Sequence, residues 1–139
     1  MPSEKKYSIW PALFIICVAF GLPITIGTIE VRVARNAHAE TVAIQQLQAI
    51  AKAENDYRHA HNRFSTNLAE LSGLPQAENS YQYDYRQLSP DAYTAVAGPT
   101  QPGKHGKRYF YMDQTGAVHY ELLRPAGPAS PEVPTLEKK

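Results

Sequence analysis

The sequence predicts an α+β fold, in which one long N-terminal helix packs on a small antiparallel meander of about four β-strands. Three patterns along the 139 residues indicate this fold. Residues 7–29 carry no charge, apolar residues recur at helical intervals between residues 44 and 64, and an alternating pattern begins at residue 80. These patterns are typical of a membrane-spanning helix, an amphipathic helix and strands with one buried face.

The uncharged run is long enough to cross a bilayer. Its 23 residues would form a helix of roughly 34 Å, against a hydrocarbon core of roughly 30 Å. We therefore predict a single-pass signal anchor at residues 7–29, preceded by a cytoplasmic stub at residues 1–6. Lys5 and Lys6 favour a cytoplasmic N-terminus, but Arg32 and Arg35 beyond the run weaken that preference. The residues expected to contact lipid or neighbouring helices are Trp10, Pro11, Phe14, Phe20, Gly21, Pro23 and Gly27.

Two other interpretations of the apolar run fit less well. A cleaved signal peptide needs a shorter apolar core and a nearby A-x-A site, whereas the A-x-A letters at residues 37–39 lie behind several charged residues. A lipoprotein needs small residues before its cysteine, and Cys17 follows two isoleucines.

An amphipathic helix is predicted at residues 30–64, as a continuation of the membrane helix. No proline or glycine interrupts residues 28–72. The opposite face of this helix is polar, so its apolar stripe is expected to cover the sheet. The residues predicted to pack between helix and sheet are Ile44, Leu47, Ile50, Tyr57 and Phe64.

The head domain is predicted at residues 65–124, where the period of the pattern changes from helix to strand. Residues 80–88, 92–97, 107–112 and 117–123 read as four strands joined by short turns and one loop rich in proline and glycine. The tail at residues 125–139 carries four prolines at intervals of three residues. It fits either a solvated, disordered end or a polyproline segment that docks on a partner.

Tyrosines and basic residues in the head form a possible binding face. Tyr81, Tyr83 and Tyr85 share one side of the first strand, and a cluster of Lys104, Lys107 and Arg108 lies in and after the long loop. The tyrosines could stack on a sugar or a peptide, although a buried core face explains the same alternation. The basic cluster fits a solvated loop equally well.

The residues of the chain contain no recognisable catalytic or metal-binding motif. His59 and His61 are two positions apart, so on a helix they point in different directions. With 14 Lys and Arg against 13 Asp and Glu, the charge gives no reason to expect nucleic-acid binding. We expect no enzymatic activity, no cofactor, no metal and no small-molecule substrate.

Four weak motifs in the right order resemble those of type IV pilins and the pseudopilins of type II protein secretion. Residues 23–42 are similar to the segment after the membrane proline of pilins, and residues 47–57 to the conserved run of the amphipathic helix. Residues 64–71 and 109–120 are similar to the loop after that helix and to the final hairpin. The chain departs from the family at its N-terminus. It lacks the glycine cleavage site and the F-T-L-I-E run of prepilins, and the position of the family's glutamate falls at about Lys6.

The resemblance implies a structural subunit in the bacterial inner membrane, with its head in the periplasm or outside the cell. The N-terminal helix would pack against membrane lipid and against other pilin-like subunits or further copies of the chain, in or beside a pilus or pseudopilus. The alternative is a free-standing single-pass membrane protein whose head binds a peptide, a glycan or a partner protein.

Overall fold

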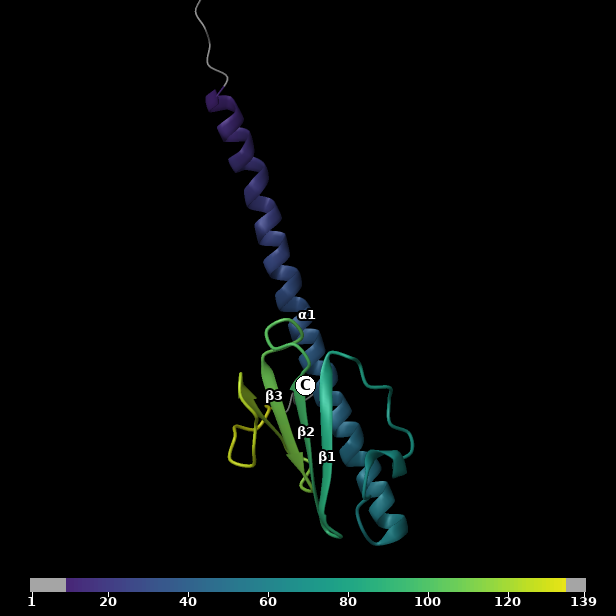
Figure 1. Ribbon diagram of the computed structural model, residues 1–139. Helices are drawn as coiled ribbons and strands as arrows, with labels where there is room; N and C mark the ends of the chain where they lie inside the picture. The colour runs from purple at the N-terminus through teal and green to yellow at the C-terminus, as the bar shows by residue number, and fades with distance from the viewer. Residues whose placement is uncertain (1–9, 135–139) are drawn as a thin grey trace, which may run out of the picture. The chain divides into compact units, whose positions relative to one another are not determined.

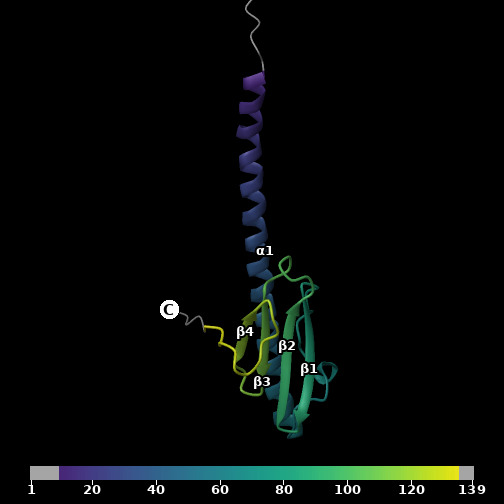
Figure 2. The same ribbon diagram turned by 60° about the vertical axis from the view of Figure 1, so that its left-hand side comes forward.

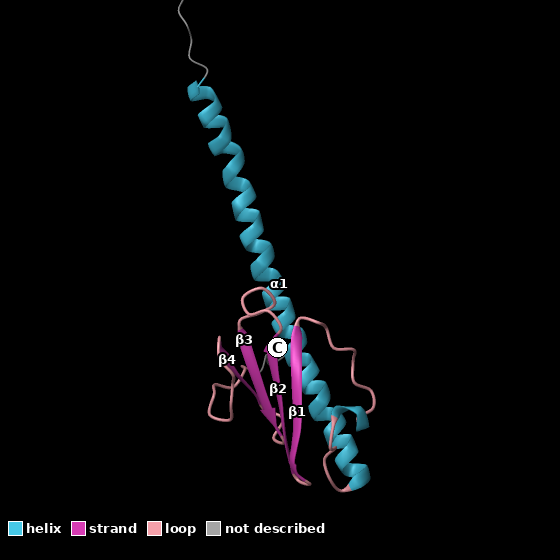
Figure 3. Cartoon of the chain, in the orientation of Figure 1, coloured by secondary structure: helices cyan, strands magenta, loops and turns pink. Residues whose placement is uncertain are grey.

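The computed structural model describes the backbone of residues 10–134 and the side chains of residues 31–134. One helix, α1 (Trp10–His61), is followed by a single 3-10 turn, η1 (Leu68–Glu70). Four strands complete the chain, β1 (Tyr81–Ser89), β2 (Ala92–Pro99), β3 (Arg108–Asp113) and β4 (Val118–Leu122). Figures 1 and 3 show these elements, which give the α+β architecture of one long helix and a four-stranded sheet.

The chain divides into two units, residues 1–34 and residues 35–139. In the first unit, the described residues belong to α1. In the second unit, which we call the head, the remainder of α1 packs on the sheet. The predicted membrane span at residues 7–29 lies outside the residues whose side chains are described. Within the part of the chain that the structure describes, no helix combines the length and the apolar character that a bilayer crossing requires.

The helix ends at His61, three residues before the predicted boundary. Asn62 takes a left-handed backbone conformation with φ of 54°, and its amide donates to the carbonyl of Arg58 at 2.8 Å. Asparagine tolerates this conformation better than most residues and is a common helix terminator. The chain then turns back, so that Phe64 lies outside the helix yet remains buried in the core.

The sheet is an antiparallel meander with the order β1-β2-β3-β4. The central pairing aligns Ala97 with Phe110 and Ala95 with Met112, and β4 continues from β3 with Met112 opposite Val118. Figure 2 shows the four strands side by side in chain order. The strand boundaries differ from those predicted by one or two residues, as expected where turns carry few constraints.

The core lies between α1 and one face of the sheet. In β2 every second residue is buried, which is the pattern of a strand with one face on the core. Ile44 and Tyr57 pack at its edge and are partly buried. The core residues are Ala39, Ala43, Leu47, Ile50, Phe64, Leu71, Tyr81, Tyr93, Ala95, Ala97, Phe110, Met112 and Val118.

The proline-rich tail folds back on the sheet over its described part, residues 125–134, so this part is not the solvated, disordered end. The amide of Tyr120 donates to the Pro131 carbonyl at 2.9 Å, and the Val133 amide donates to the Val118 carbonyl at 2.7 Å. His119 and Glu132 form an isolated antiparallel bridge. The tail therefore covers the outer edge of β4, where unpaired strand groups would otherwise be exposed.

Candidate functional site

The tyrosines of β1 face the helix, so they do not form an exposed stacking platform. Tyr81 is buried, and its hydroxyl donates to the carbonyl of Arg108 at 2.9 Å. Tyr83 is half-buried, and desolvation raises its pKa to about 12. The hydroxyl of Tyr85 donates to the Ser65 carbonyl at 2.9 Å. Period-two alternation places all three on the side of the sheet that α1 covers, which leaves no open aromatic surface for a sugar or a peptide there.

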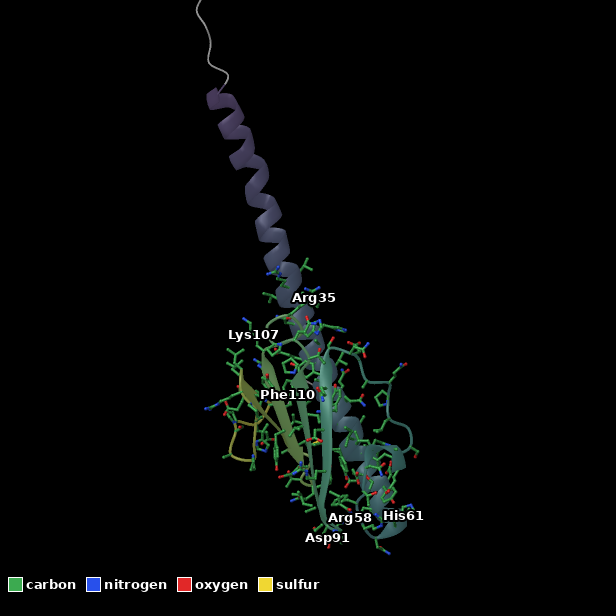
Figure 4. The ribbon with its side chains drawn as sticks, in the orientation of Figure 1. Arg35, Arg58, His61, Asp91, Lys107 and Phe110 are labelled. Atoms are coloured by element: carbon green, nitrogen blue, oxygen red, sulfur yellow. The ribbon has the colours of Figure 1, made fainter. Side chains whose placement is uncertain are left out.

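The basic residues Lys104, Lys107 and Arg108 are exposed and lie at one end of the head. We call this the proximal end. It comprises residues 35–40 of α1, the loop at residues 100–107 and residues 122–124. In Figure 4, Arg35 and Lys107 are labelled at this end, whereas Arg58, His61 and Asp91 are labelled at the other, which we call the distal end.

Contacts from α1 hold the proximal loop in place. The Glu40 carboxylate accepts a hydrogen bond from the Lys107 amide at 2.9 Å and lies 3.6 Å from the Arg108 guanidinium. The Asn36 side chain donates to the carbonyl of Gly103 at 3.4 Å. These contacts fix the backbone of the loop but leave the Lys104 and Lys107 side chains in solvent.

Gly106 allows the proximal loop to close over Tyr81. Its φ of 142° lies in a region that side chains rarely adopt, and a Cβ there would overlap the Tyr81 hydroxyl. A larger residue would push the loop away from the sheet. The glycine thus ties the position of the basic loop to the buried tyrosine.

A buried carboxylate organises the distal end. Glu54 is fully buried and accepts hydrogen bonds from the Ser65 amide, at 3.0 Å, and from the Ser65 hydroxyl. The same hydroxyl lies 3.2 Å from that of Tyr85. Burial and the hydrogen bond to Glu54 raise the pKa of Tyr85 above its ordinary value. The cluster joins α1, the following loop and β1.

This Glu-Ser-Tyr cluster superficially resembles an activated serine, but its burial argues for a structural role. Ser65 has no exposed surface, so no substrate atom reaches its hydroxyl in this conformation. The sequence alone did not single out Glu54, because a glutamate on an amphipathic helix normally faces solvent. Its place between Ile50 and Tyr57 on the apolar stripe was the signal that could have identified it.

A second carboxylate at the distal end is held at the surface. Glu70 accepts hydrogen bonds from the Thr66 hydroxyl, from the Tyr57 hydroxyl at 2.7 Å and from the Thr66 amide at 3.2 Å. These hydrogen bonds, that from Thr66 first, lower its pKa to about 2. In turn, the hydrogen bond to Glu70 raises the pKa of Tyr57. The contacts fasten the η1 segment to the end of α1.

Other surfaces of the head offer less chemistry. A shallow groove on the outer face of the sheet is lined by Val96, Gly98, Tyr109 and Pro125, with Gln82 and Asp84 at its rim. Within the described residues, no three His, Cys, Asp or Glu side chains lie close enough together to hold a metal ion.

Comparison with known proteins identifies no family. No protein-family model matches the sequence, and a search of curated proteins finds no significant match.

Proposed function

We propose that this chain is a membrane-anchored, pilin-like structural subunit, held in the bacterial inner membrane by residues 7–29. The observation that carries the proposal is that α1 has two roles. One helix of 52 residues contains most of the uncharged run and also supplies the apolar face that completes a four-stranded meander. A chain built in this way anchors and supports its head with the same element.

The helix also offers a surface to neighbouring subunits. Val31 and Val33 follow the uncharged run and have side chains 63% and 64% exposed. Residues two positions apart on a helix point roughly 200° apart, so the two valines lie on opposite sides of α1 and each could contact a different neighbouring helix. We propose that the partners are other pilin-like subunits or further copies of this chain, and that the N-terminus is cytoplasmic.

The described residues favour structural over enzymatic work. The one serine paired with a carboxylate in the core, Ser65, is sealed from solvent, and two further carboxylates of the distal end, Asp91 and Glu70, form salt bridges within the head. We therefore propose a role in assembly and no catalytic activity.

A free-standing membrane protein with a binding head is the second candidate. The groove beside Tyr109 and Pro125 favours it, because grooves lined by aromatic side chains commonly bind extended peptides. In that case the helix would need no helical partner.

The two candidate functions differ in whether a second helix contacts α1. Membranes containing the full chain are washed with alkaline carbonate, and a photoreactive amino acid is placed at Val33, with Asp84 on the outer face of the sheet as control. We expect the chain to remain in the membrane and to cross-link through position 33 to a second helix. Release by the wash would contradict anchoring, and retention without cross-links at position 33 would contradict assembly.

A further inference from the structure

The proximal end of the head carries positive charge without partners. The side chains of Arg35, Lys104 and Lys107 are exposed, and none of them forms a salt bridge with another described residue. Of the acidic residues nearby, Glu40 already engages Arg108 and the Lys107 amide. The basic groups are thus available to an anion outside the head.

Two exposed leucines lie beside this positive charge. Leu122 is 57% exposed and Leu123 is 67% exposed. The Leu123 amide donates to the Lys107 carbonyl at 2.9 Å, and Leu122 is paired with Arg108, so the leucines adjoin the basic loop. Leu123 has a left-handed φ of 60°, which is costly for a residue with a large side chain. A polar or small residue would be expected at such a position if it only met water.

The chain itself limits how far this surface lies from the proposed anchor. Arg35 follows Ile29, the last residue of the uncharged run, by six positions. Six helical residues span roughly 9 Å, and the eleven that lead to Glu40, which contacts Lys107 and Arg108, span roughly 17 Å. A tilt of roughly 20–40°, which is common for membrane helices, would bring one side of the head closer to the bilayer. The headgroup layers on each side of a bilayer occupy the first several ångströms beyond the hydrocarbon core.

From these observations we propose that the proximal end rests on the membrane. The leucine pair enters the interfacial layer, while Arg35, Lys104 and Lys107 bind the phosphates of anionic lipid headgroups. Leucine beside lysine and arginine is the composition of surfaces that lie in this layer. The inference rests on the proposed anchoring by residues 7–29. It adds that the head has a fixed lipid contact of its own, which would limit how freely it turns about the anchor.

Two variants, each carrying a single nitroxide spin label, test this contact. The full chain, with Cys17→Ser, is placed in nanodiscs that contain phosphatidylglycerol, and the label is attached through Leu122→Cys or Leu88→Cys. Leu88 lies at the distal end and is 60% exposed, which makes it a matched control. We expect a label at position 122 to be shielded from a water-soluble nickel relaxation agent and accessible to oxygen. A label at position 88 should be accessible to the nickel agent.

The charges are tested in the same system. Lys104→Glu combined with Lys107→Glu should expose the label at position 122, because each basic residue contributes roughly a fivefold preference for an anionic surface. The control is the same charge change at Lys52 and Arg86, which should leave the label shielded.

Each negative result contradicts a different part of the proposal. If the chain enters nanodiscs but positions 122 and 88 are equally accessible to the nickel agent, the lipid contact is wrong and the anchor stands. Equal shielding in phosphatidylcholine alone would contradict the role of anionic headgroups. Shielding that persists in detergent and grows with protein concentration would indicate contact between copies instead. A chain that does not enter nanodiscs defeats both the anchor and the contact.

Discussion

At the distal end of the head, carboxylates are matched with donors, whereas at the proximal end three cations have no partner among the described residues. Arg58 donates to Asp91 at 3.0 Å, and Glu54 and Glu70 each accept several hydrogen bonds. Arg35, Lys104 and Lys107 are exposed and form no salt bridge with another described residue. The difference suggests that contacts at the distal end stabilise the fold, whereas the exposed cations at the proximal end bind a partner.

Among the described residues, two adjacent exposed leucines lie at the proximal end, whereas the distal end has one exposed leucine, Leu88. Phe64 at the distal end is buried and packs edge-on against Tyr93, with ring centroids 4.8 Å apart. Leu122 and Leu123 at the proximal end are exposed. Single exposed apolar residues are common on protein surfaces, but adjacent ones form a larger apolar patch, which we propose contacts the bilayer.

The largest loss of stability is expected from truncating a core side chain at the distal end. Phe64→Ala should lower the free energy of unfolding by about 3–5 kcal/mol, because it leaves a cavity beside Tyr93. Leu122→Ala is the matched truncation at the proximal end and should change it by less than about 0.5 kcal/mol. Urea unfolding in detergent, followed by tyrosine fluorescence, measures both. Similar losses for the two variants would show that the two ends do not differ.

A smaller loss is expected from Glu54→Gln. The substitution keeps the shape of the side chain but turns one acceptor oxygen into a donor that faces the amide or the hydroxyl of Ser65. A buried donor left without an acceptor costs about 1–3 kcal/mol. Asp84→Asn on the exposed outer face is the control and should have little effect in the same unfolding assay. An unchanged stability for Glu54→Gln would mean that the cluster does not hold the distal end.

Acid should weaken the distal end through Glu70. Its pKa falls from 4.5 to about 2 on folding, so its contribution to stability is fully present above pH 4.5 and is lost as the pH falls toward about 2. The urea midpoint of the wild type should therefore decline over that range, and Glu70→Gln should decline less. Identical pH profiles for the two proteins would contradict the hydrogen bonds assigned to Glu70.

Only a small effect on stability is expected from combining Lys104→Ala and Lys107→Ala. Both side chains are exposed, so together they should change the free energy of unfolding by less than about 1 kcal/mol. Their loss should instead weaken association of the head with anionic bilayers. Marked destabilisation, measured by thermal unfolding, would mean that the lysines support the loop and are not reserved for a partner.

Much of the fold could be predicted from the sequence because its apolar residues recur at spacings typical of a helix and then of strands. The stripe that includes Leu47 and Ile50 indicated the helix face, and the alternation at Tyr81, Tyr83 and Tyr85 indicated a strand. That alternation also favoured burial of the tyrosines, and Tyr81 is buried while Tyr83 and Tyr85 pack partly buried against the core.

The remainder depended on contacts between distant residues. Nothing in the local pattern predicts that Glu54 meets Ser65, because that meeting requires the reversal after Asn62. The tail prolines share a spacing that suggested an extended segment, but the backbone groups at Pro131 and Val133 pair with β4. The proximal surface is assembled from three separate segments, so only the structure brings Leu122 beside Lys107.

Hydrogen–deuterium exchange of the full chain tests the contrast between the two ends most directly. The exchange rates of residues 100–107 and 122–124 are compared with those of residues 87–92 at the distal end, first in detergent and then in bilayers that contain phosphatidylglycerol. We expect the bilayer to slow exchange at the proximal segments and to leave the distal hairpin unchanged. Equal rates in detergent and in bilayers at both ends would contradict this expectation.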